Sequence, residues 1–223
     1  INAASRMGSP EAAARLLAST DFAEANELAR HLGRINDERK ILVVMTVKEA
    51  NKRLRASPVK SPLIVIGNPL WRPGILGLVA SSLAETHGKP VFLWGRDGST
   101  SLTAGGSIIR GSCRSDGELN VVELMRNAGD IFENFGGHHG AGGFSISEEK
   151  VHGLSARLSD VFDSLGVAKI LEQEIIVDRA LNIAEVGHAR AALAKMAPFG
   201  VGNQKPLFLF PNVSIFSARA FGK

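Results

Sequence analysis

Cysteine is almost absent from this chain: Cys113 is the only one among 223 residues. A lone cysteine excludes an internal disulfide and a four-cysteine zinc site, and this usage is typical of a reducing compartment, so we expect a cytoplasmic protein. The sequence also lacks an apolar run of the roughly 20 residues that cross a bilayer, and it lacks the apolar stretch of a secretory signal. We therefore expect no membrane partner. A first methionine is missing too, which predicts a piece of a longer protein.

A strong charge of one sign is lacking as well. The sequence has 26 Lys and Arg against 22 Asp and Glu, which gives a formal net charge of +4 at pH 7. Such a small excess favours an anionic partner only weakly. What the chain does contain is apolar content, because 44% hydrophobic residues can fill the core of one large domain or two small ones.

The first part of the chain predicts two helices. A short helix is expected over 10–18, where Pro10 can occupy the first turn. A long amphipathic helix is expected from about Asp21 to Arg55, since apolar residues recur there at three- and four-residue spacing, with an interruption near Gly33. A helix of this length is typical of a connector between two domains.

The middle of the chain predicts an α/β fold. "LIVIG" (63–67) and "VFLW" (91–94) have the composition of buried strands, and Pro73 starts a helix between them, so a parallel pair with a right-handed crossover is expected. In the rest of this part we expect a strand with a glycine bulge at 101–109, helices over 119–132 and 147–165, and a strand at 144–146. A domain boundary is expected at 167–172. Beyond it we expect a strand over 171–183, a helix over 184–199 and one or two strands over 205–216.

Five glycines surround two adjacent histidines in "FGGHHGAGGFSI" (135–146). Such freedom of the backbone indicates unusual dihedral angles or a close approach by a ligand. Gly136 and Gly137 could let N–H groups converge on a phosphate while His138 or His139 adds a donor. A tight turn with a histidine that is hydrogen-bonded within the protein explains the pattern equally well. A metal site is disfavoured, because the remaining histidines show no ligand spacing.

A second candidate is "SIIRGSCRSDG" (107–117). Arg110, Ser112, Arg114 and Ser115 are the guanidinium and hydroxyl donors that bind phosphodiesters, although a solvated loop would have the same composition. We expect Cys113 to be a packing residue, since no base for activating a nucleophile is evident near it.

The start of the helix at 73 is a third candidate for anion binding. Its free N–H groups and its partial positive charge favour an anion, and Arg72 precedes them. The alternative is that Gly74 and Gly77 only allow close packing. Clustered carboxylates of a two-metal hydrolase are missing from the sequence. The residues thus predict a chain that holds an anionic substrate without cleaving it.

Five motifs in this order resemble the DHH/DHHA1 phosphoesterases, specifically the members that degrade single-stranded DNA. The resemblance covers nearly the whole chain and is carried by "INAASRMG" (1–8), "WRPGILGLVASSL" (71–83), "GSCRS" (111–115), "FGGHHGAGGFSI" (135–146) and "MAPFGVGNQKPLF" (196–208). It implies the tail of a DHH catalytic domain (1–20), a connecting helix (21–56), a DHHA1 substrate-binding domain with a mixed sheet flanked by helices (57–168), and a partial OB-like β domain (169–223).

The resemblance also implies roles for the motif residues. His138 would face the reacting phosphate and take part in catalysis, and the catalytic Mn²⁺ or Mg²⁺ would be bound by the DHH domain, so no metal site is expected in this chain. The substrate-binding set expected from the family match and the donor chemistry together is Arg6, Arg72, Arg110, Ser112, Arg114, Ser115, Gly136, Gly137 and His139.

The function implied by the resemblance is that of a 5′→3′ exonuclease on single-stranded DNA in repair and recombination. The intact protein would act as a monomer, with a helicase or a single-strand-binding protein as partner, and this chain alone would be inactive. Two alternatives stay open: a related phosphodiesterase acting on nanoRNA or pAp, and a scaffold that binds without cleaving. The scaffold is kept open by three departures from the family pattern, which are Arg72 for histidine, and Ser5 and Cys113 for glycine.

Overall fold

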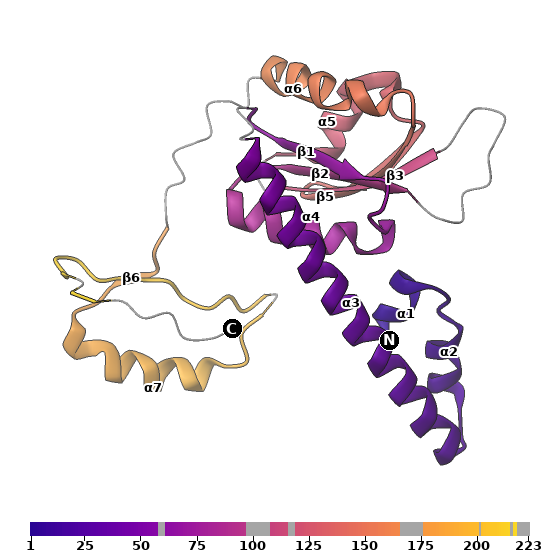
Figure 1. Ribbon diagram of the computed structural model, residues 1–223. Helices are drawn as coiled ribbons and strands as arrows, with labels where there is room; N and C mark the ends of the chain where they lie inside the picture. The colour runs from indigo at the N-terminus through magenta and orange to yellow at the C-terminus, as the bar shows by residue number, and fades with distance from the viewer. Residues whose placement is uncertain are drawn as a thin grey trace. The chain divides into compact units, whose positions relative to one another are not determined.

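The computed structural model forms two compact units, Ile1–Ile170 and Leu171–Lys223, which we describe separately (Figure 1). The first unit is a mixed five-stranded sheet flanked by helices and preceded by a long helix, so the predicted α/β class is confirmed. The structure describes residues 1–57, 61–96, 108–115, 119–165, 176–200, 202–214 and 216–217.

The long helix α3 (Phe22–Ala56) has 35 residues and is about 52 Å long. It begins after Asp21, whose side chain accepts a hydrogen bond of 2.8 Å from the backbone N–H of Ala23. The interruption expected near Gly33 does not occur, because a single glycine costs a helix only about 1 kcal/mol and packing exceeds that. Two short helices, α1 (Asn2–Met7) and α2 (Glu11–Ala18), pack against its first half.

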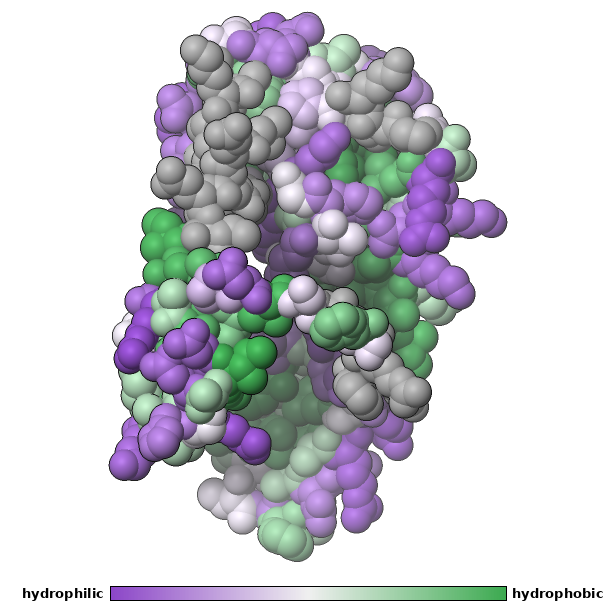
Figure 2. All heavy atoms as spheres, turned by 90° about the vertical axis from the view of Figure 1, so that its left-hand side faces the viewer, coloured by the Kyte–Doolittle hydropathy of each residue, from purple (hydrophilic) through white to green (hydrophobic). Residues whose placement is uncertain are grey.

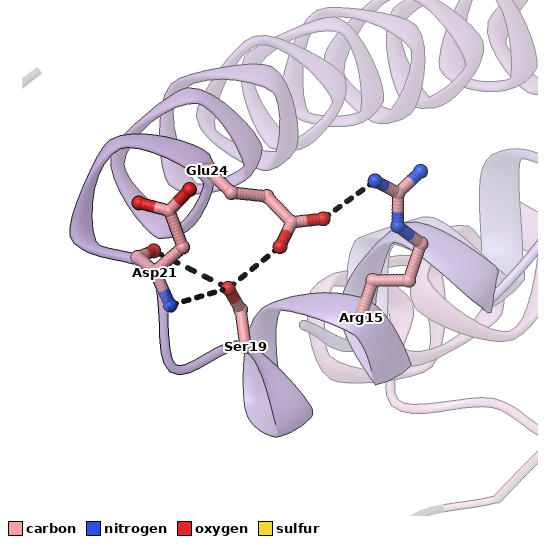
Figure 3. A network of polar contacts seen from close by, with 4 residues as sticks. All are labelled: Arg15, Ser19, Asp21 and Glu24. Carbon is pink, nitrogen blue, oxygen red and sulfur yellow. Dashed lines mark hydrogen bonds and ion pairs between the residues drawn. The ribbon is translucent and has the colours of Figure 1, made fainter.

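A polar network joins α2 to the start of α3 (Figure 3). The Arg15 guanidinium lies 2.5 Å from the Glu24 carboxylate, and the Ser19 hydroxyl donates to the same carboxylate over 2.7 Å. These two partners lower the pKa of Glu24, with Arg15 the larger cause. The network links α2 to the start of α3, although an exposed ion pair adds little to stability.

The sheet of the first unit has the strand order β1-β2-β3-β5-β4. Its first two strands are parallel and are joined through α4, which confirms the predicted strand–helix–strand unit, and all other pairs are antiparallel. The bounds are β1 (Ile64–Asn68), α4 (Pro73–His87), β2 (Val91–Arg96), β3 (Ile108–Arg114), α5 (Val121–Ala128), β4 (Asn134–His138), β5 (Ala141–Ser147) and α6 (Leu154–Ser164). The strand expected over 101–109 falls mainly outside the described residues.

Helices cover both faces of this sheet, with α3 and α4 on one side and α5 and α6 on the other (Figure 1). Because side chains alternate along a strand, Val91 and Leu93 of β2 pack toward α4, and Phe92 packs toward α5 and α6. On the α4 side, the helix packs on β2 and β3. All five residues of β4 are exposed.

The described part of the second unit contains a short 3-10 helix (Ile183–Glu185), the α-helix α7 (Val186–Met196), and two short parallel strands, β6 (Arg179–Ala180) and β7 (Phe208–Leu209). Leu181 is the one buried side chain among its described residues. Exposed apolar side chains also occur among hydrophilic ones on the side of the molecule that Figure 2 shows. Of the strand expected over 171–183, residues 171–175 lie outside the described ranges.

Among the described residues, no helix is both long enough and apolar enough to span a membrane.

Candidate functional site

The arginine-rich segment forms a strand and not a loop. In β3, Ile109 and Cys113 point into the core shared with α5 and α6, and this alternation puts Arg110, Ser112 and Arg114 on the opposite face. The solvated loop considered from the sequence is therefore wrong for these three residues. Their backbone is fixed by ladders to β2 on one side and β5 on the other.

The glycine-rich segment is also part of the sheet, as the hairpin of β4 and β5. Residues that are paired across antiparallel strands point to the same face. The register therefore aligns three rows on the face that carries the arginines. They are row one (Arg114, Ala141 and His138), row two (Ser112, Gly143 and Gly136), and row three (Arg110, Ser145 and Asn134). Arg114 and His138, two strands apart, have backbones about 10 Å from each other.

Row two has no side chain on β5 and β4, because both of its residues there are glycines, and we call this part of the sheet the bare floor. A Cβ atom added at Gly136 would meet nothing within 4 Å, and one at Gly143 would meet only the Gly111 carbonyl oxygen at 3.7 Å. Neither position has a positive φ that would favour glycine. Glycine costs a strand roughly 0.5–1 kcal/mol and marks a site that a ligand or another backbone approaches closely. Packing among the described residues therefore does not explain these two glycines.

Other glycines of the cluster are explained by packing alone. A Cβ at Gly142 would lie 2.8 Å from the Met125 Cε atom on the core side of the sheet. Gly137 has φ 151°, and a Cβ there would lie 2.2 Å from the backbone oxygen of Ala141. Gly137 therefore shapes the hairpin, and its predicted contact with substrate stays a prediction.

The Arg114 side chain is held along the sheet and not free in solvent. Its Nη1 atom donates to the backbone oxygens of Cys113 at 2.6 Å and Gly142 at 3.5 Å. A Cβ at Gly77 of α4 would come within 2.8 Å of the Nη2 atom, so the absence of a side chain at Gly77 makes room for the guanidinium. Within the described parts of the chain, no carboxylate pairs with Arg114 or Arg110. Both charges are thus available to an anion.

Cys113 takes no part in this face. Its thiol is fully buried in the core with α5, and burial raises its pKa to about 12. Since the thiolate is the nucleophilic form, the group is inert at neutral pH. The departure from glycine at this position therefore adds a side chain to the core and not to the rows.

The turn after His138 is fixed by backbone hydrogen bonds. The His139 carbonyl accepts from the N–H of Val121 at 2.8 Å, and the Gly140 carbonyl accepts from the N–H of Ser115 at 3.0 Å. The Ser115 hydroxyl donates to the Leu119 carbonyl at 2.7 Å, so its proton already has an acceptor within the protein. His138 and His139 are both exposed.

Arg72 lies at the start of α4, where Glu49 of α3 holds the preceding loop. The Glu49 carboxylate accepts from the Trp71 indole N–H at 3.0 Å and from the Asn68 amide at 2.9 Å, and it pairs with Arg53 at 2.6 Å. These contacts lower the pKa of Glu49, with the Trp71 bond the largest cause. Arg72 itself is exposed and caps the helix without a side-chain bond.

We predict that Glu49→Gln destabilises the chain by about 1 kcal/mol, because an amide cannot accept from both Trp71 and Asn68. A lowered pKa in the folded state means that the carboxylate stabilises the fold above its ordinary value of 4.5 and loses this effect as the pH falls further. The variant should thus lose less stability than the parent between neutral pH and acid. Urea unfolding of the parent and the variant at neutral and at acid pH checks this. An equal loss of unfolding free energy in both proteins would contradict it.

Arg6 is not part of the three rows, which lie on strands. It is in the last turn of α1, and its backbone oxygen abuts Gly74, where an added Cβ would be 2.0 Å away. Its side chain lines an open depression of about 500 Å³ with Arg39 and Asn36 of α3. The Nε atom of Arg39 is buried there without a partner among the described residues. Ser5, the other departure in this segment, is exposed and donates to the Asn2 carbonyl.

In the described ranges, no three His, Cys, Asp or Glu side chains converge as a metal site requires. The resemblance assigns the divalent metal to the DHH catalytic domain, and no chemical step is assigned to a metal within this chain.

Asn134 and Ser145 are candidates that reasoning from the sequence missed. Neither belongs to a phosphate-binding pattern by itself. Their place in row three beside Arg110 depends on the strand register, which the spacing of residues in the sequence does not reveal.

Comparison with known families places two domains on the chain. A DHHA1 domain matches residues 60–164, and a RecJ OB domain matches residues 177–223.

Individual relatives agree with these domains. The chain is 30% identical over its whole length to the single-stranded-DNA-specific exonuclease RecJ of Bacillus subtilis, and 33% identical over 94% of its length to that of Thermus thermophilus. It covers 28% and 29% of these two proteins. A crystal structure of Thermus thermophilus RecJ in complex with Mg²⁺ matches with a TM-score of 0.74 and 32% identity, over 93% of this chain and 31% of that one. The chain therefore spans less than a third of these relatives.

Proposed function

Because this chain carries the DHHA1 and OB domains of a RecJ-like protein, we propose that it holds the sugar-phosphate backbone of single-stranded DNA on the face formed by rows one to three. The observation that carries this proposal is the bare floor at Gly136 and Gly143, with cationic Arg114 beside it on β3. A phosphate backbone could approach the sheet there as closely as the strands allow.

Each group in rows one and two has a physical role in this proposal. Arg114 donates charged hydrogen bonds to a phosphate from the guanidinium atoms that the sheet carbonyls leave free. Ser112 adds a hydroxyl donor, and His138 donates from an imidazole nitrogen on the far side of the same phosphate. A guanidinium suits this task better than an ammonium would, because its planar fork matches two phosphate oxygens.

For the whole protein we propose metal-dependent 5′→3′ hydrolysis of single-stranded DNA, and this proposal is supported by its RecJ relatives, which are single-stranded-DNA-specific exonucleases. RecJ of Thermus thermophilus has been crystallised with Mg²⁺ and with Mn²⁺. In this proposal a divalent metal is bound outside the present chain and activates the attacking water. The chain alone binds strands without cleaving them, and a helicase or a single-strand-binding protein delivers the strand to a monomeric enzyme.

The departures from the family pattern do not favour the scaffold alternative. Cys113 faces the core, Ser5 is bonded within α1, and Arg72 keeps a cationic group at the start of α4. The OB domain at 177–223 favours the exonuclease over a shorter phosphodiesterase.

We expect Arg114→Ala to weaken binding of a 5′-phosphorylated oligothymidylate about tenfold, because one charged contact is lost. Titration at several salt concentrations should also give a plot of log K against log salt whose slope is shallower by about 0.7. Arg114→Lys should keep the slope, since the charge stays, but still bind more weakly than the parent.

The matched control is Arg126→Ala, which removes an exposed cation from α5 on the other side of the sheet. It should change neither affinity nor slope. Thermal melting of each variant separates lost binding from lost folding. An unchanged affinity and slope in a folded Arg114→Ala protein would contradict the proposed grip. Cleavage of the oligonucleotide by this chain alone would contradict its assignment as a binding part.

A further inference from the structure

We propose that Arg110, Asn134 and Ser145 form a second phosphate subsite, so that the bound strand runs along β3, β5 and β4 and not across them. This inference rests on the proposed function and adds to it the direction of the bound strand and the place of a second contact. Neither Asn134 nor Ser145 has a role in the resemblance from which the other site residues came.

The three side chains of row three are available to a ligand. Arg110 and Asn134 are exposed, and Ser145 is half-buried beside them. In the described part of the chain, no hydrogen bond or ion pair occupies any of these side chains. A guanidinium, an amide and a hydroxyl on one face can together surround a single phosphate with donors.

The spacing of the rows fits a nucleic-acid backbone. Two residues along a strand advance about 7 Å, which is comparable to the distance between neighbouring phosphates of an extended single strand. Arg114 and Arg110 are four residues apart, so rows one and three are separated by two such steps. Because α4 covers β3 itself, a strand lying along β5, beside the β3 arginines, would place one phosphate at each row, with the bare floor of row two between rows one and three.

Helix α4 blocks the direction across the strands. A backbone crossing from β4 toward β2 would meet α4, which packs on β2 and β3. At row three, the start of α4 lies beside β3 on the β2 side. The reason is that Arg110 pairs with Gly95, where an added Cβ would lie 2.1 Å from the Trp71 carbonyl oxygen. Arg72 follows Trp71 directly in the chain, so its backbone lies near row three.

The test is a length series of 5′-phosphorylated oligothymidylates bound to the full chain. Arg110→Ala, and separately the double variant Asn134→Ala with Ser145→Ala, should weaken binding about tenfold for strands of three or more phosphates. Binding of the mononucleotide should change less than about twofold in either variant. Arg114→Ala should weaken binding at every length. Arg126→Ala is again the control for loss of charge.

A second measurement changes the ligand, and its first readout uses the parent chain alone. A single neutral methylphosphonate is moved along the oligonucleotide. In the parent, the position two phosphates away from the one sensitive to Arg114→Ala should weaken binding, and in Arg110→Ala the same position should have no effect.

If Arg114→Ala weakens binding but no neutral position depends on Arg110, the second subsite is wrong and the proposed function stands. If neither arginine matters, the proposed function itself fails.

Discussion

Gly143→Val should abolish most of the binding of single-stranded DNA while leaving the chain as stable as before. A valine at this position would stand on the floor of row two, in a space where an added Cβ meets only the Gly111 carbonyl oxygen at 3.7 Å. The side chain would keep a phosphate backbone away from the sheet and separate it from both arginines. We expect affinity to fall about a hundredfold, or about 2.7 kcal/mol. The fold should be unaffected or slightly stabilised, since valine favours strands more than glycine does.

A size series makes this prediction sharper. Gly143→Ala should weaken binding less than Gly143→Val, and Gly136→Val should resemble Gly143→Val because the two residues are paired across β4 and β5. Gly33→Ala on the exposed side of α3 serves as a glycine control that should leave affinity unchanged. Fluorescence anisotropy gives the affinity, and thermal melting gives the stability. Full binding by a folded Gly143→Val protein would show that the bare floor is not the place where DNA lies.

Phe144→Ala should have the largest effect on stability, a loss of about 3–5 kcal/mol of the free energy of unfolding. The Phe144 ring lies under β3, so close to Gly111 that an added Cβ there would be 2.1 Å from it. It also contacts the rings of Phe92 and Phe132, with centroids 6.1 and 5.2 Å away. Losing the ring leaves a cavity directly beneath the arginine face.

The melting temperature of this variant should fall by about 10 °C, followed by circular dichroism. Phe135→Ala is the matched control, because Phe135 is 38% exposed and its ring contacts Phe132 at the edge of the same cluster. That variant should lose much less stability. A similar loss in both would mean that the core beneath the sheet depends less on Phe144 than its burial indicates.

Local patterns were sufficient to predict the parallel unit of β1, α4 and β2. Its strands are short apolar runs, and its helix starts at Pro73 and ends at Gly88, which adopts φ 58°. Each of these signals acts within a few residues, so it can be recognised from the sequence alone. The interruption of α3 was predicted wrongly, because the propensity of one glycine was given more weight than packing along the rest of that helix.

The site was harder to predict, since strand β4 has almost no strand signal of its own. Asn134–His138 contains two glycines, and all five of its residues are exposed. Its structure comes from pairing with β5, which is a tertiary effect. The residue types for binding phosphate could be read from the motifs, but whether Arg114 and His138 share a face depends on the register. Asn134 and Ser145 were missed for the same reason.

Ala50 of α3 has a consequence far from its own position. It is fully buried among the residues by which α3 packs on α4, at a place where only a small side chain lets the two helices approach. The part of the helix between Phe22 and Ala50 is about 42 Å long. A tilt of the helix by about 10° at Ala50 would move its Phe22 end by about 7 Å. The small volume of Ala50 thus contributes to the position of α1 and α2, which also depends on the contact of α1 with α4.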